Sequence, residues 1–391
     1  MPMKVGFNYA WAWERYGMQV GPYVTPNDAA WDAYTDFLSG RPVPRFLPSP
    51  TITNLARNLK ELSAMGISVV RWFILGSGPN FGRSPQRTLI VEGGRRRTVW
   101  KFTPPPSIDP RFTIHFRAML EVFRAAKMQL IPSIVDFPMF ADADVRPDAN
   151  GLAYGGRADL LRDKKLRSYF INGLFLDLLL VARDFRDVIY AFEVMNEPIW
   201  LLMPDVHPEL PTWKLAKANE QNGAVLLYWP IVSSSDLTDF LTDALALVKA
   251  FDLPSTVGHR FYYDIQNFPT GSLPQFHYYA KTVTVGGFSV GDRTSVPTFS
   301  GNPPPFLGEF SSDKGSADQN KPWPDLSGKD TTLERLKLLE AKGCQLCLIW
   351  PDLGGKNIGD CSPLYSGGPT KCDPIKLHPD TIAQIKKFTG H

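Results

Sequence analysis

The segment FEVMNEPIW, residues 192–200, is an apolar run that ends abruptly in the polar tripeptide NEP. Its aromatic and β-branched residues are typical of a buried strand, and Pro198 marks a point where a regular strand stops. A simple turn would explain this pattern, with Glu197 as a surface or capping residue. The rest of the chain decides whether the strand instead presents Glu197 for chemistry.

Similar short strands recur along the chain and alternate with helical segments, the pattern of βα units around a parallel sheet. The predicted strands are residues 4–9, 68–74, 129–137, 188–196, 255–263, 274–279, 305–310 and 344–350. The predicted helices are residues 51–66, 109–127, 158–185, 234–251 and 330–343, with none after the sixth strand. Eight strands close a barrel. We therefore expect one α/β domain over residues 1–391, a (β/α)8 TIM barrel with long βα loops on its C-terminal face.

Long segments follow most predicted strands and would emerge together at the C-terminal face of the barrel, where this fold builds its sites. They are residues 10–50, 75–108, 137–157, 198–232, 280–304, 311–328 and 351–376. All ten tryptophans lie in these segments or near the C-terminal end of a predicted strand. Aromatic rings around one cleft suit sugars, whose C–H faces are apolar and whose edges carry hydroxyl groups.

A second carboxylate repeats the arrangement of Glu197. The segment PPPFLGEFSS places Glu309 at the end of the seventh predicted strand, whereas Glu197 follows the fourth. In an eight-stranded barrel, the ends of these two strands face each other across the mouth. Glycoside hydrolysis requires such a pair, with one carboxyl group to protonate the leaving oxygen and one to attack the sugar or activate water.

Residues at other strand ends complete a pattern with the two carboxylates. They are Arg71 on strand two, His277 and Tyr279 on strand six, and Trp350 on strand eight. Together with NEP after strand four and GEF on strand seven, they resemble the clan A retaining glycoside hydrolases, most closely glycoside hydrolase family 5. The resemblance covers nearly the whole barrel. It departs after strand three, where the segment SIVDFPMF has Asp136 and Phe137 in place of a histidine that is frequent in the family.

The resemblance implies a retaining mechanism with a different role for each acid. Glu197 would be the general acid/base and must hold a proton near neutral pH, whereas Glu309 would be the nucleophile and must stay ionised. Arg71 and Tyr279 would favour the charged form of Glu309 by ion pairing and hydrogen bonding. We expect the two carboxyl groups to lie about 5–5.5 Å apart, rather than the roughly 6.5–9.5 Å of an inverting pair.

The resemblance also implies residues that bind the sugar. Asn196 would donate a hydrogen bond to the 2-hydroxyl, His277 would line the reacting subsite, and Trp350 would form its floor. We expect further substrate contacts from Trp200 and from three residues that simple packing would explain equally well, namely Trp11, His259 and Tyr263. Glu193 shares a strand face with Glu197 but lies deeper, so we interpret it as a paired interior carboxylate rather than a catalytic group.

Charge and composition argue against other classes of function. The 391-residue chain has a net charge of +3, too small to indicate binding to nucleic acid or to an anionic membrane. No apolar stretch approaches the ~20 residues that span a bilayer, and the N-terminal segment lacks the apolar core of a secretory signal. We expect a cytoplasmic protein unless a signal was removed, and we favour a monomer. The basic run Arg95–Arg97 is expected at a solvated hairpin tip.

The four cysteines lie at positions 344, 347, 361 and 372, a grouping that superficially resembles a zinc site. Cys344 and Cys347, however, are three residues apart on a predicted strand and therefore face opposite sides of it. We expect them to be buried free thiols, and a local disulfide between Cys361 and Cys372 stays an open alternative. The chain has neither a Gly-rich phosphate loop nor an HExxH motif, so we expect no cofactor and no metal.

We therefore expect a retaining β-glycosidase that hydrolyses β-linked oligo- or polysaccharides of glucan or mannan type. Two alternatives stay open, a clan A β-glycosidase for xylosides or galactosides and a catalytically inactive barrel that only binds carbohydrate. Loss of either carboxylate would indicate the inactive barrel, and both are present. A metal-dependent hydrolase would need clustered ligands at strand ends, and the chain has only six histidines. The fold and motifs do not identify the sugar.

Overall fold

The barrel strands are short runs of apolar residues buried on both faces, as expected where helices cover a closed parallel sheet. They are β1 (Lys4–Tyr9), β4 (Val69–Phe73), β7 (Gln129–Asp136), β9 (Phe192–Asn196), β11 (Ser255–His259), β12 (Gln275–Tyr278), β15 (Phe306–Ser311) and β16 (Leu346–Trp350). In this computed structural model the strands pair in the order β1-β16-β15-β12-β11-β9-β7-β4, and β4 closes the barrel in parallel register with β1. The predicted (β/α)8 barrel is confirmed, although the fourth strand begins at Phe192 rather than at residue 188 and the fifth ends at His259 rather than at residue 263.

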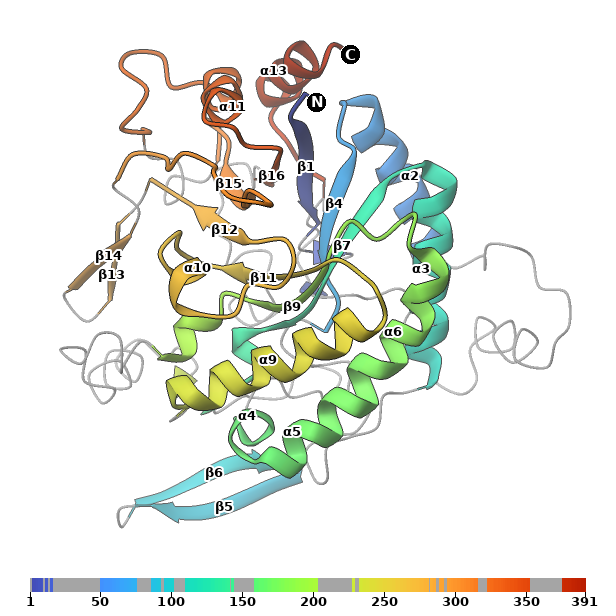
Figure 1. Cartoon of the computed structure of the whole chain (residues 1–391), viewed down its shortest axis with the longest axis vertical. Helices are drawn as coiled ribbons and strands as arrows, with labels where there is room; N and C mark the ends of the chain where they lie inside the picture. Colours follow the sequence, from blue (N-terminus) through green and yellow to red (C-terminus); the bar gives the residue numbers. More distant parts are fainter. Residues whose placement is uncertain are drawn as a thin grey trace, which may run out of the picture.

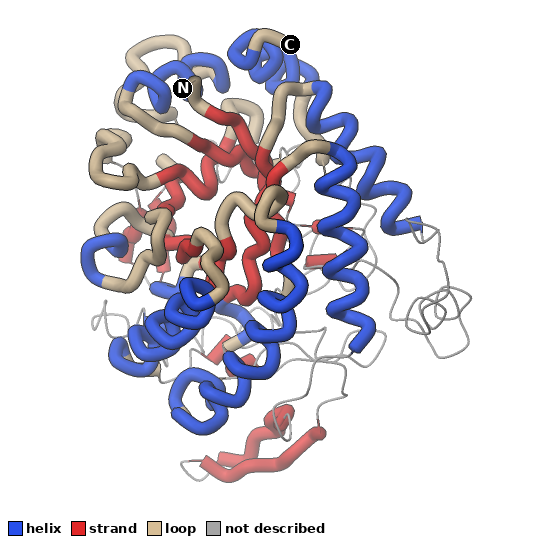
Figure 2. The backbone as a smooth tube through the Cα atoms, turned by 45° about the vertical axis from the view of Figure 1, so that its right-hand side comes forward, coloured by secondary structure: helices blue, strands red, loops and turns tan. Residues whose placement is uncertain are grey.

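The structure describes residues 2–9, 11–12, 15–16, 50–75, 86–92, 95–101, 110–140, 142–143, 158–202, 227–228, 232–280, 282–285, 288–291, 294–315, 322–351 and 375–391. Within these ranges the helices surround the strands, and both termini lie at the end of the barrel where β1 begins (Figures 1 and 2). Parallel strands that begin together also end together. Their carboxyl ends therefore share the opposite mouth of the barrel.

Of the long helices described on the outside of the barrel, the first four begin and end close to their predicted positions, whereas the last was not predicted. They are α2 (Pro50–Ala64), α3 (Pro110–Ala126), α9 (Ser234–Ala250), α11 (Thr332–Ala341) and α13 (Pro379–Thr389). At the start of α9, the Ser233 side chain accepts from the Asp236 N–H and the Asp236 carboxylate accepts from the Ser233 N–H. This reciprocal capping box satisfies two backbone donors that a helix start would otherwise leave unpaired.

The segment at 158–185, predicted as one helix, is broken into pieces. These are α4 (Asp159–Arg162), α5 (Lys164–Phe170), the π-helical turn η3 (Ile171–Phe175), α6 (Leu176–Ala182) and the 3-10 turn η4 (Arg183–Phe185). Asp163 interrupts the first helix because its side chain accepts from the N–H groups of Lys165 and Leu166 and starts a new one. The aspartate acts as an N-cap inside an otherwise helical pattern.

The core between barrel and helices is rich in aromatic rings. Phe240 of α9 packs against Phe140, Phe170 and Phe175 at centroid distances of 5.6, 6.3 and 6.1 Å. Two tryptophans also belong to this core rather than to the barrel mouth. Trp72 is 1% exposed and Trp323 is 2% exposed. The position of a tryptophan near a strand end therefore does not by itself place its ring in the site.

Four two-stranded antiparallel sheets accompany the barrel in the described residues. Three are hairpins: β2 (Trp11–Ala12) with β3 (Arg15–Tyr16), β5 (Gln86–Glu92) with β6 (Arg95–Lys101), and β13 (Thr282–Val285) with β14 (Phe288–Gly291). The fourth pairs β8 (Asp142–Ala143) with β10 (Leu227–Tyr228), which are distant in sequence. The β5–β6 pair confirms the predicted hairpin around the basic run, and the described residues between β12 and β15 contain no helix, as predicted. No helix in the described part of the chain is long and apolar enough to cross a bilayer.

The two cysteines of the eighth strand segment are buried free thiols, as predicted. Cys347 lies on β16, and Cys344 lies two residues before the strand begins. Burial raises the pKa of the Cys344 thiol to about 12 and that of Cys347 well above its ordinary value. Cys361 and Cys372, for which a disulfide is an open alternative, lie outside the described residues.

Candidate active site

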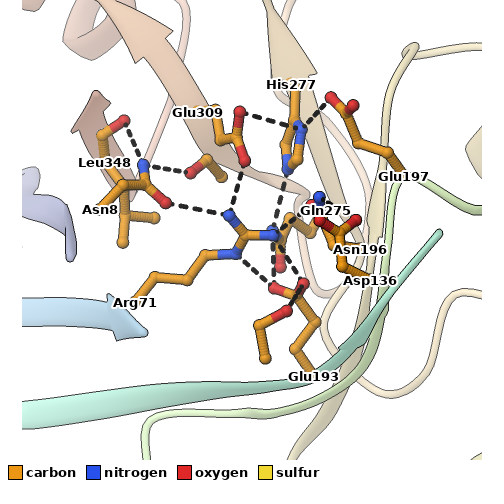
Figure 3. Close-up of polar contacts among 12 residues, drawn as sticks. Asn8, Arg71, Asp136, Glu193, Asn196, Glu197, Gln275, His277, Glu309 and Leu348 are labelled. Atoms are coloured by element: carbon orange, nitrogen blue, oxygen red, sulfur yellow. Dashed lines mark hydrogen bonds and ion pairs between the residues drawn. The ribbon is translucent and has the colours of Figure 1, made fainter. Parts of the chain in front are cut away.

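Polar side chains from four strands converge at the mouth of the barrel (Figure 3). Arg71 lies on β4, His277 on β12 and Glu309 on β15, and Glu197 directly follows β9. Strands β12 and β15 are neighbours, with His277 opposite Glu309 in the parallel register. Arg71 and His277 are fully buried, whereas the side chain of Glu197 keeps 14% of its exposure. The cluster is thus closed below and open on the side of Glu197.

Arg71 is the centre of this cluster and donates from all five of its N–H groups. Its Nε and Nη2 each bind an oxygen of Glu193 at 2.6 Å, and its Nη1 binds Glu309 Oε1 at 2.7 Å. The other two N–H groups reach Asn8 Oδ1 at 3.0 Å and Asn196 Oδ1 at 2.5 Å. Although burial opposes it, the two carboxylates raise the pKa of Arg71 above its ordinary value. Its positive charge is therefore permanent.

Glu309 lies among groups that stabilise a negative charge. Besides Arg71, its Oε2 accepts from the Tyr279 hydroxyl at 2.7 Å and lies 3.5 Å from His277 Nδ1. Burial first, and the charge of Glu309 second, raise the pKa of Tyr279 well above its usual value, so the phenol stays a neutral donor. Hydrogen bonds and an adjacent cation favour the ionised form of a carboxyl group.

The backbone of Glu197 is strained. Its φ is +42°, in the left-handed region that non-glycine residues rarely adopt. Such a conformation costs on the order of 1–3 kcal/mol and persists where the surroundings impose it. Here the Glu197 N–H donates to Gly258 O at 2.7 Å, and Pro198 begins the 3-10 helix η5 (Pro198–Leu202). The NEP turn thus aims the carboxylate back over the barrel instead of continuing the strand.

Glu197 has an electrostatic environment opposite to that of Glu309. Its Oε2 accepts from Trp200 Nε1 at 2.6 Å, and its Oε1 lies 2.8 Å from His277 Nδ1 and 3.8 Å from Arg260 Nε. Burial nevertheless raises the pKa of Glu197, because it outweighs the lowering effects of Arg260, Trp200 and Arg71. A carboxyl group with a raised pKa can hold a proton at a higher pH than an ordinary glutamic acid.

The contacts of His277 determine which of its nitrogens carries the proton. Gln275 donates from Nε2 to Glu193 at 3.0 Å, and this same nitrogen lies 3.4 Å from His277 Nε2. The Gln275 carbonyl oxygen is turned the other way and accepts from Thr256 at 3.2 Å. His277 Nε2 is therefore the acceptor, and Nδ1–H faces the carboxylates of Glu197 and Glu309. Burial lowers the pKa of His277 to about 3, so the ring is neutral at ordinary pH.

The two carboxylates are close together. One oxygen of Glu197, one of Glu309 and a ring nitrogen of His277 all lie within 4.8 Å of one another. Three such ligand atoms have the spacing of a metal site. Arg71 and Arg260, however, already supply positive charge at this position, so the donor set fits these side chains better than a metal cation.

Asn196 is held in a single orientation by two contacts. Its oxygen must face the Arg71 donor, and its Nδ2 therefore faces the acceptor Asp136 Oδ1 at 2.9 Å. Asp136 also accepts from the Phe137 N–H and is 2% exposed. The departure from the family pattern after strand three thus places a buried carboxylate beside Asn196. This contact leaves one N–H of Asn196 for another acceptor.

Two further predicted residues lie beside the cluster. Trp350, at the end of β16, is 7% exposed, and its ring lies 6.3 Å from Phe73, which in turn lies under the Arg71 guanidinium. Tyr263 is 46% exposed and stacks on Phe261 at 5.0 Å, just before the short helix α10 (Asp264–Asn267). Contact of either ring with a substrate stays a prediction. Trp11 belongs to β2, and its side chain lies outside the described residues.

His259 does not face the carboxylates, contrary to the prediction. Its ring is fully buried, lies 3.1 Å from Pro269 O and stacks on Phe268. The inward position next to it on β11 is Gly258, where a Cβ atom would lie 2.8 Å from Glu193 Oε1 and 3.0 Å from Arg71 Nη2. Because neighbouring residues on a strand face opposite sides, His259 points out of the barrel.

The sequence analysis did not single out several residues of the cluster. Arg260 lies within the predicted fifth strand, although β11 ends one residue before it. Asn8, Ser133 and Gln275 are fully buried polar residues within apolar strands. A polar side chain in a run that is otherwise buried on both faces must find a partner, and this was the signal available for the last three.

No protein-family model matches the chain, and no curated protein is similar to it in sequence. Solved structures are similar in fold. An endo-1,4-β-mannanase from Eisenia fetida superposes with a TM-score of 0.55 at 14% identity, covering 100% of this chain and 91% of the other. A β-1,4-D-mannanase from Cryptopygus antarcticus gives 0.51 at 14% identity, with 96% and 95% covered. An exo-β-1,4-mannosidase from Opitutaceae bacterium strain TAV5 gives 0.52 at 12% identity, with 99% and 59% covered.

The chain has the fold of these enzymes. They are glycoside hydrolases, the class of enzyme that the strand-end motifs resemble, so the resemblance inferred from the sequence extends to the arrangement of the whole chain. At identities of 12–14% the likeness concerns the fold alone.

Proposed function

We propose that this protein is a retaining β-glycosidase that cleaves β-linked mannans or mannosides, with Glu309 as nucleophile and Glu197 as general acid/base. The observation that carries the proposal is the pair of carboxylates at the mouth of the barrel, with oxygens within 4.8 Å of each other and opposite electrostatic surroundings. A separation this short suits direct attack on the sugar and leaves too little room for the water of an inverting enzyme. Mannan is proposed because the similar folds are those of β-mannanases and a β-mannosidase.

The first step of the proposed reaction forms a covalent glycosyl-enzyme. Glu309, ionised and held by Arg71 and Tyr279, attacks the anomeric carbon while the glycosidic bond breaks. Glu197 gives its proton to the departing oxygen and so becomes ionised itself. Trp200 and Arg260 then stabilise the new charge on Glu197. The remaining N–H of Asn196 is available to the sugar 2-hydroxyl, where a hydrogen bond strengthens as positive charge develops on the ring.

The second step releases the sugar. Glu197, now a carboxylate, takes a proton from water, and the water oxygen attacks the anomeric carbon and displaces Glu309. Both carboxyl groups return to their starting protonation states, and two inversions leave the configuration retained. Neither step calls for a cofactor, and the substrate partner is a carbohydrate.

Activity on defined sugars tests the proposal. The purified protein should hydrolyse aryl β-mannosides or β-1,4-mannan more rapidly than the corresponding β-glucosides, β-xylosides, β-galactosides and glucans. NMR of the first product should show the β-anomer. A wild-type protein that binds mannan but cleaves none of these substrates would instead support the binding-only barrel.

Two variants separate the roles of the acids. Glu309→Ala should lose turnover of every substrate, because no leaving group can compensate for a missing attack. Glu197→Ala should still release a burst of phenol from an activated aryl glycoside and then turn over slowly, because no base activates water. Azide needs no base, so it should accelerate this variant and yield a β-glycosyl azide. The reverse pattern would show that the two roles are exchanged.

A further inference from the structure

Glu193 is a buried carboxylate that the proposed reaction does not use. It is fully buried on β9, below the mouth of the barrel, and each of its oxygens accepts two hydrogen bonds. Oε1 accepts from Arg71 Nη2 at 2.6 Å and from Ser133 Oγ at 2.7 Å, whereas Oε2 accepts from Arg71 Nε at 2.6 Å and from Gln275 Nε2 at 3.0 Å. Four donors on two oxygens favour a carboxylate that is ionised and cannot rotate.

Two chains of contacts connect Glu193 with the two proposed catalytic groups (Figure 3). The first is the guanidinium of Arg71, which binds Glu193 on one edge and Glu309 through Nη1. The second runs from Glu193 through the Gln275 amide to His277 Nε2, and from His277 Nδ1 to Glu197 at 2.8 Å. One deep carboxylate therefore contacts Arg71, which binds the proposed nucleophile, and Gln275, which contacts the histidine beside the proposed acid/base.

We propose that Glu193 is a positioning residue that sets the pH range in which Glu309 is ionised while Glu197 is protonated, acting on Glu309 through Arg71 and on Glu197 through Gln275 and His277. This inference rests on the proposed glycosidase function. Glu193 touches no reacting atom in this scheme. It orients the guanidinium by a two-point contact, and it selects the His277 tautomer by holding the Gln275 amide with its nitrogen toward the ring.

The charges around the site support this role. The positive groups that face the site are Arg71 and Arg260, and the negative ones are Glu193 and Glu309. The carboxyl group of Asp136, at the end of β7, lies beside Asn196. His277 and Tyr279 are neutral. Without Glu193 the balance would move by one unit toward positive charge. This less negative surrounding would promote loss of the proton that Glu197 must hold before the first step.

The pH dependence of kcat/KM tests the inference with Glu193→Gln, which keeps the shape and removes the charge. In the proposed scheme for the wild type, the acid limb reports ionisation of Glu309 and the basic limb reports loss of the Glu197 proton. Because the two carboxyl groups are close, the apparent pKa values of the profile belong to the pair. We expect both limbs of the variant to move to lower pH by about one unit, the size of a charge effect over several ångströms at an effective dielectric constant near 20. A fall in kcat/KM with both limbs unmoved would overturn the inference.

Three matched variants isolate the two chains of contacts. Ser133→Ala removes a hydrogen bond from the same carboxylate without changing charge, and it should leave both limbs within about 0.3 units. Glu193→Asp keeps the charge but shortens the reach, so kcat should fall while the limbs stay in place. Gln275→Met frees the His277 tautomer, so Nδ1 can accept a hydrogen bond from the protonated Glu197 carboxyl group, and the basic limb alone should move to higher pH. If the Gln275→Met limbs coincide with those of the wild type, the second chain is wrong.

Each variant is first checked for a cooperative thermal transition, and the rate of trapping by a 2-deoxy-2-fluoro-β-mannosyl fluoride is measured against pH. This reagent reports attack by Glu309 and needs little help from the acid/base. The acid limb of the trapping rate should move in Glu193→Gln and stay in place in Gln275→Met. Failure of the wild type to cleave any β-glycoside would refute the proposed function. An active wild type with unmoved limbs in the variants would refute the role of Glu193 alone.

Discussion

Replacing Trp200 by phenylalanine removes one hydrogen bond from Glu197 and keeps most of the ring. The Trp200 Nε1–H donates to Glu197 Oε2 at 2.6 Å, and it lowers the pKa of that carboxyl group by stabilising its charged form. The indole also packs against Phe137 and Phe261, each at a centroid distance of 6.3 Å. Phenylalanine preserves these apolar contacts but cannot donate. The pKa of Glu197, already raised by burial, should therefore rise further.

The size of the effect follows from the strength of the lost bond. A hydrogen bond to a charged group contributes about 1.5–3 kcal/mol, and the partial exposure of Glu197 favours the lower end of that range. Because 1.36 kcal/mol corresponds to one pKa unit, the basic limb of kcat/KM should move up by about one pH unit. The acid limb, which reports Glu309, should stay where it is.

The assay is the pH profile of kcat/KM for an aryl β-mannoside with a poor leaving group, whose cleavage depends on the proton of Glu197. Phe137→Leu is the matched control, because it disturbs the packing of Trp200 without removing the hydrogen bond. Its limbs should coincide with those of the wild type. The reasoning is wrong if Trp200→Phe leaves the basic limb unmoved or shifts it to lower pH.

Four other outcomes are expected. Burial lowers the pKa of His259 to about 4, so as the pH falls below about 6.5 the unfolded chain binds a proton before the folded one does and the fold loses stability. Between neutral pH and pH 4, the free energy of unfolding from chemical denaturation should therefore fall by about 3 kcal/mol less in His259→Phe than in the wild type. Arg71→Lys offers three donors in place of five and should destabilise the fold by about 3–5 kcal/mol in the same measurement, with activity at background. Phe240→Ala should cost about 3–5 kcal/mol while leaving the KM of the folded protein unchanged, since the cavity lies behind the barrel wall. Metal analysis should find no stoichiometric zinc that resists chelators, and finding such an ion at Cys344 and Cys347 would contradict the strand argument.

The barrel could be predicted because each strand carries its own signal. Runs such as SVVRWFI and CQLCLIW are apolar, short and bounded by turns, and a strand buried on both faces tolerates few other sequences. Errors occurred where a local contact overrode the pattern. Strand four begins at Phe192 rather than 188, after the bridge between Leu130 and Ile189, and the helix predicted at 158–185 is interrupted by the Asp163 cap.

The candidate site was predictable to the extent that its residues end strands. Glu197, Glu309 and Arg71 stand out because a polar group interrupts an apolar run at a fixed place in the barrel. His259 was misplaced for the opposite reason, since the inward residue beside it is Gly258, which has no side chain to mark its face. Arg260 was missed although it lies in the predicted strand and shares the inward parity of Gly258; β11 ends one residue before it, and its guanidinium reaches Glu197 from there.

The complete use of the Arg71 donors affects how charge can move during a reaction. A carboxylate in water is solvated by molecules that must turn when its charge is transferred to a sugar, and that turning contributes to the barrier. Around Glu309 the corresponding dipoles belong to a guanidinium whose every N–H is engaged and to a phenol in a fixed hydrogen bond. None of them can follow the departing charge. In the proposed reaction, the polarisation that favours ionised Glu309 is therefore present before the sugar arrives, and it is still in place when water regenerates the carboxylate.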